Sequence, residues 1–155
     1  LDLVDQHGTA VTEHSFAGQH MLIYFGYTYC PDVCPTTLST MIQALDLLPA
    51  KQAEQVVPIF ITIDPERDTV EQMALYAPLF HPRLVALTGT REATDSAAKA
   101  YRVLHKKAGG GDDYLVDHSS FVFLMGPDGA YVDHFHGSVS PKRIAEGMAE
   151  ALASG

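Results

Sequence analysis

Two cysteines, Cys30 and Cys34, are the only cysteines in this 155-residue chain, and they stand four positions apart. This CxxxC spacing differs from the CxxC of disulfide oxidoreductases and from the paired cysteine groups of common zinc sites. In a regular helix, residues i and i+4 have Cβ atoms about 5–6 Å apart, whereas a disulfide joins Cβ atoms about 3.5–4.5 Å apart. A shared metal ion tolerates the wider separation, so the spacing favours a metal site.

The residue after the pair, Pro35, indicates where a helix begins. Proline is favoured at the first helical position, which predicts Cys34 at the N-cap and Cys30 in the preceding turn. The helix dipole there favours the thiolate, the form that binds soft metals and attacks disulfides. A structural disulfide is the plain alternative in an oxidising compartment, but a bridge across so short a loop removes little unfolded-state entropy.

Alternating strands and helices are predicted around this pair. The apolar run 21–25 has the length of a buried strand, and apolar residues at helical spacing predict a helix over 35–48. A second buried strand is expected over 56–63, with an irregularity at Pro58 near its start. Asp68 and Glu71 resemble a capping box that opens a helix through Phe80.

The remaining elements complete an α/β pattern. An N-terminal β segment within 1–16 turns at His7-Gly8, and a strand is expected at 84–87. A helix follows from its N-cap Thr90 to about Lys106, and a loop at 109–113. Strands at 120–125 and 130–135 form a hairpin around Pro127-Asp128-Gly129, and Ser140-Pro141 opens a final helix. We expect one domain over residues 1–155, with a central mixed sheet flanked by helices and the first buried strand leading into a cysteine-bearing helix, as in the thioredoxin-like fold.

Composition narrows the ligands and partners. A net charge of −9 and a pI near 5.2 argue against nucleic acid and anionic lipid, which need clustered Lys and Arg. No apolar stretch reaches the roughly 18 residues that span a bilayer. The chain starts at Leu1 without an initiator Met or a signal-like segment, so we expect a processed or truncated form with a membrane anchor upstream.

Three separated motifs resemble the Sco (SenC) family of copper-binding proteins, which assemble the copper centre of cytochrome c oxidase. They are the cysteine segment 26–38, Ile63-Asp64-Pro65-Glu66-Arg67-Asp68-Thr69, and Tyr114-Leu115-Val116-Asp117-His118-Ser119. The chain departs from the family at Tyr29, where a histidine is frequent, and at Phe123, where a tyrosine is frequent. Neither position is a presumed ligand.

The resemblance implies that Cys30, Cys34 and His118 bind copper, as Cu(I) and as Cu(II). The donor types agree, because thiolates suit Cu(I) and an added imidazole gives a mixed site that also holds Cu(II). The implied role is a copper metallochaperone and not an enzyme. Its expected partner is a copper-receiving oxidase subunit or another copper chaperone, with no nucleic acid and no membrane contact by this domain, which would act as a monomer. Its expected place is the periplasm, tethered to the inner membrane, or the mitochondrial intermembrane space.

Two other functions are alternatives to copper delivery. A thiol-disulfide oxidoreductase that reduces the oxidase cysteines would carry a proline before the final hairpin, where this chain has His118-Ser119-Ser120. A peroxidase would carry a Thr or Ser three residues before its reactive cysteine and a proline seven before, and neither cysteine fits. The first remains a possible second activity.

Several nearby residues have both a functional and a plain interpretation. Asp117 could orient His118, and Asp64 and Asp68 could form an ion-pair cluster around Arg67, although a turn and a helix cap explain both carboxylates equally well. His134 and His136 share one face of a predicted strand, which allows a second metal site, but solvated side chains at a strand end are the simpler interpretation.

Overall fold

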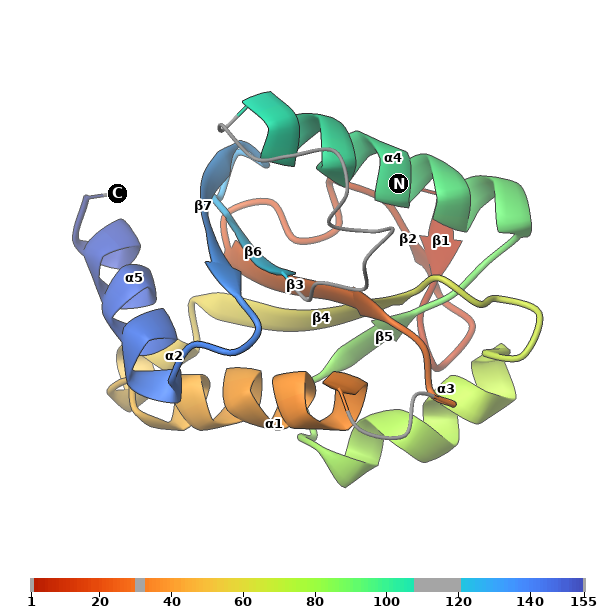
Figure 1. The fold of residues 1–155 in the computed structure, drawn as a ribbon, viewed down its shortest axis with the longest axis horizontal. Coiled ribbons are helices and arrows are strands. Elements are labelled where there is room, and N and C mark those ends of the chain that lie inside the picture. Colours follow the sequence, from red (N-terminus) through yellow and green to blue (C-terminus); the bar gives the residue numbers. More distant parts are fainter. Residues whose placement is uncertain (1, 30–32, 108–120, 155) are drawn as a thin grey trace.

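A mixed β-sheet forms the centre of the structure (Figure 1), which is a computed structural model. The structure describes residues 2–29, 33–107 and 121–154, and of residues 33, 34, 102–107 and 154 it describes the backbone alone. Among these residues, the strand order is β5-β4-β3-β6-β7. The strands are β3 (His20–Gly26), β4 (Val56–Thr62), β5 (Val85–Leu87), β6 (Phe121–Met125) and β7 (Tyr131–His136). Strands β3, β4 and β5 are parallel, β6 pairs antiparallel with β3, and β7 pairs antiparallel with β6.

Helices cover both faces of the sheet (Figure 1). On one face lie α1 (Val33–Asp46), α3 (Val70–Tyr76) and α5 (Pro141–Ser154), with the short α2 (Ala50–Ala53) and the 3₁₀ turn η1 (Ala77–Leu79). The other face is covered by α4 (Arg91–Lys107) and by a small hairpin of β1 (Leu3–Val4) and β2 (Ala10–Val11). No helix in the described parts of the chain is long and apolar enough to cross a membrane.

Strand β3 divides its side chains between two hydrophobic cores. Leu22 and Tyr24 pack with α1 and α5, whereas Met21, Ile23 and Phe25 pack with α4 and the β1–β2 hairpin. Successive side chains of a strand point to opposite faces, and a strand buried on both faces reads as a continuous apolar run. The expected sheet, its flanking helices, the N-terminal β segment and the closing hairpin and helix are confirmed. One domain over the whole chain stays a prediction.

The two ends of the sheet carry different segments. Strands β3, β4 and β5 all finish at one end, which we call the carboxyl end of the sheet. Strand β6 begins there, because Val122 pairs with Tyr24, and β7 finishes there, because His136 pairs with Phe121. The chain therefore leaves β3 toward the cysteines, and enters β6 after the segment with His118, at the same end of the sheet.

Two predicted helix starts are wrong by one or two residues. Helix α1 begins at Val33, so Cys34 lies inside the first turn and not at the N-cap. Pro35 is still accommodated, because the first backbone N–H groups of a helix have no intrahelical acceptor. Helix α3 is capped by Thr69, whose Oγ1 accepts a hydrogen bond from the Gln72 backbone N–H, and not by Asp68.

Other local predictions can be checked directly. The helix predicted to reach Phe80 ends at Tyr76 and continues as η1. The irregularity expected at Pro58 is absent from the regular β3–β4 pairing in the described residues, and β5 begins only opposite Ile59. The caps predicted at Thr90 and Ser140 are confirmed, with bonds of 3.0 Å and 3.2 Å to backbone N–H groups of the next turn.

Candidate metal centre

The three predicted ligands lie at or beyond the limits of the described residues. Cys30 and His118 are outside them, and only the backbone of Cys34 is described, as the second residue of α1. Helix α1 starts near the carboxyl end of the sheet, and His118 is three residues before β6 in sequence. The three-ligand site therefore stays a prediction.

A buried carboxylate, that of Asp68, holds the chain just before the cysteines. Its oxygens accept three hydrogen bonds, from the Thr28 backbone N–H at 3.0 Å, the Thr28 hydroxyl at 2.5 Å and the Thr62 hydroxyl at 2.7 Å. Asp68 is fully buried, and hydrogen bonds to a carboxylate are stronger than neutral ones. The network fixes Thr28, two residues before Cys30, against the end of β4 and the start of α3.

The hydroxyl of Thr28 is also an acceptor, from the Gln72 side-chain amide at 3.0 Å. Helix α3 therefore holds the cysteine-bearing segment from a second direction. Sequence reasoning assigned Asp68 to a helix cap and missed this role. A usable signal was present, because Thr28 and Thr62 follow or end adjacent parallel strands and so meet at one end of the sheet.

The residue directly before Cys30 carries an exposed aromatic ring, since Tyr29 is 56% exposed. The guanidinium carbon of Arg67 lies 4.6 Å from the centre of this ring, and the Nε of Arg67 donates to Asp64 at 2.5 Å. That hydrogen bond raises the pKa of Arg67. The ion pair expected around Arg67 thus exists with Asp64 but not with Asp68, and a charged guanidinium stacks on the ring.

The β4–α3 loop is held from its other side by Arg91, at the start of α4. Arg91 donates two hydrogen bonds to Glu66, a third to the Ile63 carbonyl oxygen at 3.1 Å and a fourth to Asp95 at 3.3 Å. A forked guanidinium suits paired binding of a carboxylate. These contacts join the loop to the helix on the opposite face of the sheet.

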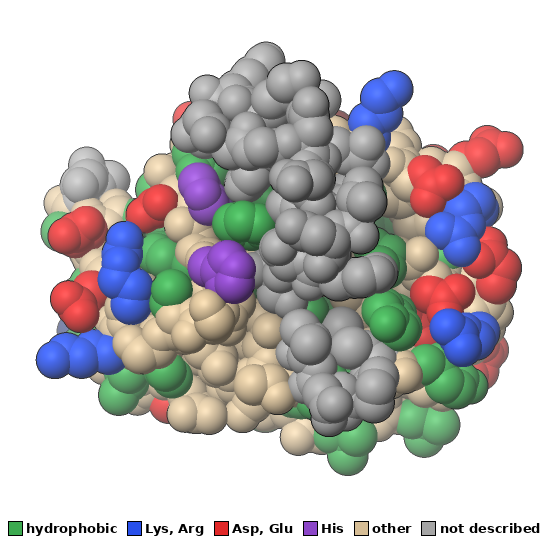
Figure 2. Space-filling model, viewed as in Figure 1, with side chains coloured by type: hydrophobic (Ala, Val, Ile, Leu, Met, Phe, Trp, Pro, Cys, Tyr) green, Lys and Arg blue, Asp and Glu red, His purple; other side chains and the backbone are tan. Residues whose placement is uncertain are grey.

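The charges on one face of the molecule gather at its two sides, while histidine and hydrophobic side chains lie between them (Figure 2). In the described part of the chain, no group of three or more His, Cys, Asp or Glu residues is close enough to hold a metal ion. A metal site of three protein ligands would therefore need residues outside that part, as the predicted set does.

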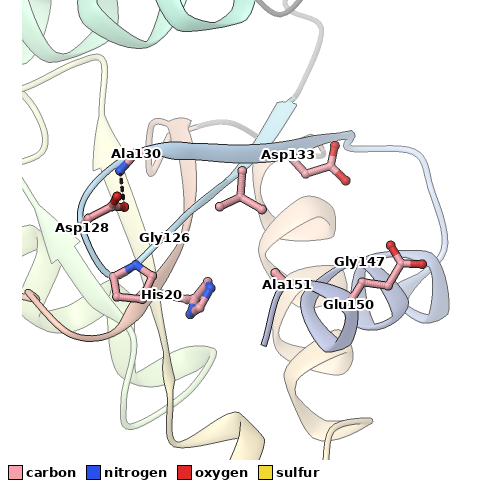
Figure 3. A pocket seen from close by; sticks show the side chains of 10 residues that line it. His20, Gly126, Asp128, Ala130, Asp133, Gly147, Glu150 and Ala151 are labelled. Atoms are coloured by element: carbon pink, nitrogen blue, oxygen red, sulfur yellow. Dashed lines mark hydrogen bonds between the residues drawn. The ribbon is translucent and has the colours of Figure 1, made fainter. Parts of the chain in front are cut away.

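A separate hollow lies at the other end of the sheet (Figure 3), with a volume of about 450 Å³. It is bounded by His20 at the start of β3, Asp128 in the hairpin turn, and Gly147 and Glu150 of α5. His20 is 6% exposed; burial lowers its pKa, against a smaller opposite effect of Asp128. The hollow lies at the end of the sheet opposite the carboxyl end, and none of its lining residues is a predicted copper ligand.

The sequence is similar to curated proteins along most of this chain. The chain is 42% identical to "Protein SCO2 homolog, mitochondrial" of Homo sapiens over 98% of its length, and 44% identical to the human "Protein SCO1 homolog, mitochondrial" over 96%. It spans 58% and 50% of the length of these two relatives.

Solved structures of similar proteins share the fold of this chain. The crystal structure of yeast Sco1 with copper bound has a TM-score of 0.85 and 35% identity, covering 99% of this chain and 90% of that one. The crystal structure of Arabidopsis thaliana ScoI with copper bound has a TM-score of 0.83 and 30% identity, covering 100% and 97%. The expected thioredoxin-like fold is confirmed. Since the family model described as SCO1/SenC also matches residues 1–153, the chain belongs to the SCO1/SenC family.

Proposed function

We propose that this chain binds a copper ion through Cys30, Cys34 and His118 and delivers it during assembly of the copper centre of cytochrome c oxidase. The observation that best supports the proposal is topological. The end of β3 and the start of β6 share the carboxyl end of the sheet, so segments about ninety residues apart in sequence enter and leave at one place. Yeast Sco1 and A. thaliana ScoI, of which the match covers 90% and 97%, were solved with copper bound.

The donor set suits copper as cargo. The N-terminus of the 14-residue helix α1 stabilises thiolates, because backbone N–H groups and the helix dipole favour negative charge there. Binding of Cu(I) replaces the proton of each thiol that is not already ionised, and that proton passes to solvent. Two thiolates and one imidazole leave a coordination position open, through which a ligand of the receiving protein can enter.

The described residues around this set serve to position it. Asp68 holds Thr28 before the first cysteine, and Arg67 covers the ring of Tyr29. Such supporting contacts fix the direction from which a ligand approaches a metal, and their loss costs affinity without loss of a ligand. In this role, these side chains position the site, whereas the cysteines and His118 bind the metal.

The partner follows from the same proposal. A copper-receiving oxidase subunit, or another copper chaperone, would accept or supply the ion at the open position. The chain would work in the periplasm, held near the inner membrane by an upstream anchor, or in the mitochondrial intermembrane space of a eukaryote. Its net charge of −9 favours a basic contact surface on that partner.

Copper titration of the reduced protein tests the proposal. We expect the reduced protein to bind one Cu(I) per chain, and its Cu(II) form to show a thiolate-to-copper charge-transfer absorption that is lost in Cys30→Ser, Cys34→Ser and His118→Ala. His14→Ala is a matched control, because the His14 side chain is 84% exposed. A His118→Ala protein with unchanged affinity and spectrum would overturn the three-ligand set. Turnover of a disulfide substrate by metal-free protein that binds no copper would instead favour the thiol-disulfide oxidoreductase.

A further inference from the structure

The hollow opposite the carboxyl end of the sheet has a buried imidazole at its base. His20 is 6% exposed, and its ring has no hydrogen-bond partner among the described residues. It lies two residues before Leu22 on β3, which places it on the face that packs with α5 (Figure 3). Buried polar groups normally have a partner, and a hollow of about 450 Å³ falls within the roughly 300–1,000 Å³ of small-molecule sites. The imidazole therefore indicates a group that binds from outside the chain.

A glycine keeps the space beside this imidazole open. The β3–β6 register, continued by one residue beyond its last pair, sets His20 opposite Gly126. Opposite residues of an antiparallel pair have Cβ positions about 4.5–5.5 Å apart on the same face, so an ordinary side chain at 126 would fill this space. A Cβ there would lie 3.2 Å from Oδ1 of Asp128 and 3.4 Å from Cγ2 of Val132. The imidazole, the Asp128 carboxylate and Val132 thus surround one open position.

An irregularity in β7 directs a second carboxylate to the same hollow. The β6–β7 register shifts between Leu124 and Met125, which leaves Val132 as the extra residue of a β-bulge. Asp133 follows the bulge opposite Leu124, whose side chain packs in the core with α5. Bulges re-aim side chains and are frequent beside functional sites. Here the adjacent residues Val132 and Asp133 both line the hollow.

The rim of the hollow is acidic. Its charged residues are Asp128, Asp133 and Glu150, and none of the described residues that line it is Lys or Arg. Oδ1 of Asp128 accepts a hydrogen bond from the Ala130 backbone N–H at 3.0 Å. Oδ1 of Asp133 accepts one from the His134 backbone N–H at 2.8 Å. An ionised carboxylate has about four acceptor positions, so these bonds orient both aspartates and leave acceptor positions for a ligand.

These groups match an organic cation that carries several N–H groups. Burial lowers the pKa of His20, so its ring is neutral at neutral pH, offers an acceptor nitrogen and does not repel a cation. A metal ion fits poorly, because no three His, Cys, Asp or Glu residues of the described part could hold one. A guanidinium presents its N–H donors in one plane and is less strongly hydrated than an ammonium. Its donors suit carboxylates on two sides of the hollow and an acceptor at its base (Figure 3).

We propose that this hollow binds a guanidinium group through the carboxylates of Asp128 and Asp133 and the acceptor nitrogen of His20. Val132 and Ala151 also line the hollow, and their apolar side chains suit the alkyl chain that carries such a group. The guanidinium can belong to a small molecule or to an arginine side chain of another protein, since both present the same chemistry. The site lies at the opposite end of the sheet from the proposed copper ligands and takes no part in copper binding.

NMR titration of the reduced, metal-free chain tests the proposal with two probes, methylguanidinium and arginine capped as its Nα-acetyl methylamide. We expect each probe to cause saturable shifts of the amide signals of His20, Gly126 and Gly147. Tighter binding of the capped arginine would identify an arginine side chain as the ligand, whereas equal or tighter binding of methylguanidinium would identify a small molecule. Citrulline capped in the same way has nearly the same shape but no charge, and it should bind about tenfold more weakly than the capped arginine.

Substitutions in the hollow locate the binding. Asp128→Asn and Asp133→Asn keep the oxygen that accepts the local backbone N–H, so each removes only the charge and should weaken binding about tenfold. His20→Leu removes the ring nitrogens and should also weaken it. Ala151→Leu keeps all three binding groups but fills the hollow, so it should weaken binding as well. Asp95→Asn is the control, because Asp95 is 63% exposed on the helix that covers the other face, and it should leave the affinity unchanged.

Three results would overturn the proposal. They are an unchanged affinity when Asp128 and Asp133 are both replaced by Asn, shifts that map away from the hollow, and binding of a capped lysine as tight as that of the capped arginine. Because this titration contains no copper, none of these results would affect the proposed copper delivery. Conversely, a failure of copper delivery by the unaltered chain would not change the shifts caused by the guanidinium probes.

Discussion

Replacement of Asp68 by Asn tests whether the buried carboxylate holds the chain before the cysteines. Asparagine has nearly the same shape but no charge. Its Oδ1 can take the place of the carboxylate oxygen that accepts from the Thr28 N–H and the Thr62 hydroxyl. Its Nδ2 can then donate to the Thr28 hydroxyl, which now donates to Asp68. All three contacts survive in the variant, so the substitution measures the loss of charge.

The expected cost follows from these three hydrogen bonds. Bonds to a charged group contribute about 1.5–3 kcal/mol each and neutral ones about 0.5–1.5 kcal/mol, so the loss is about 1 kcal/mol a bond, or about 3 kcal/mol. A neutral amide is less costly to bury than a carboxylate, which offsets part of this loss. We therefore expect Asp68→Asn to lower the free energy of unfolding by about 2 kcal/mol.

Urea unfolding followed by circular dichroism measures this change. With a denaturant dependence of about 2 kcal/mol/M, the midpoint should fall by about 1 M. Asp95→Asn is the matched control, because Asp95 is 63% exposed and its ion pair with Arg91 is a surface pair. Such pairs contribute less than about 1 kcal/mol. If Asp68→Asn shifts the midpoint no more than Asp95→Asn does, the charge of Asp68 does not strengthen the three hydrogen bonds of the network.

Two further substitutions test the packing at the other end of the sheet. Burial lowers the pKa of His20, so the His20 imidazole binds a proton more weakly in the folded protein than in the unfolded chain. The stability that neutral His20 contributes is therefore present above about pH 6.5 and is lost as the pH falls below that value. Between pH 7.5 and 5.5, the free energy of unfolding measured in urea should therefore fall less for His20→Gln than for the unaltered protein. An equal fall in both proteins would contradict this explanation. Gly147→Ala places a Cβ 2.4 Å from Cζ of the buried Phe135. The overpacking should cost about 1–3 kcal/mol, which exceeds the gain of about 1 kcal/mol from the better helix propensity of alanine. We therefore expect a lower melting temperature, and a higher one would refute the predicted clash.

Most of the fold could be predicted because burial follows a short local period. The run in β3 is apolar throughout because both its faces are buried, and the spaced apolar residues of α1 are buried as expected. The turn at Gly129, with φ of +83°, and the caps at Thr90 and Ser140 were also predictable, since each depends on neighbours within three residues.

The errors lie where a side chain can satisfy either a local or a distant partner. Asp68 and Thr69 are adjacent and both can cap a helix, and only the folded chain shows that Asp68 bonds to Thr28, forty residues earlier, while Thr69 caps α3. The bonds from Arg91 to Glu66 likewise join the start of α4 to the distant β4–α3 loop. The candidate ligands followed from motifs and a family resemblance, because the spacing of two cysteines cannot name a histidine far along the chain.

X-ray absorption spectroscopy of the reduced protein loaded with one Cu(I) per chain tests the central claim most directly, because it counts the atoms bound to the metal. The account predicts two sulfur neighbours and one nitrogen neighbour, with the nitrogen lost in His118→Ala and one sulfur lost in Cys30→Ser or Cys34→Ser. A copper ion with only sulfur neighbours, or one whose surroundings are the same in His118→Ala, would contradict the proposed site.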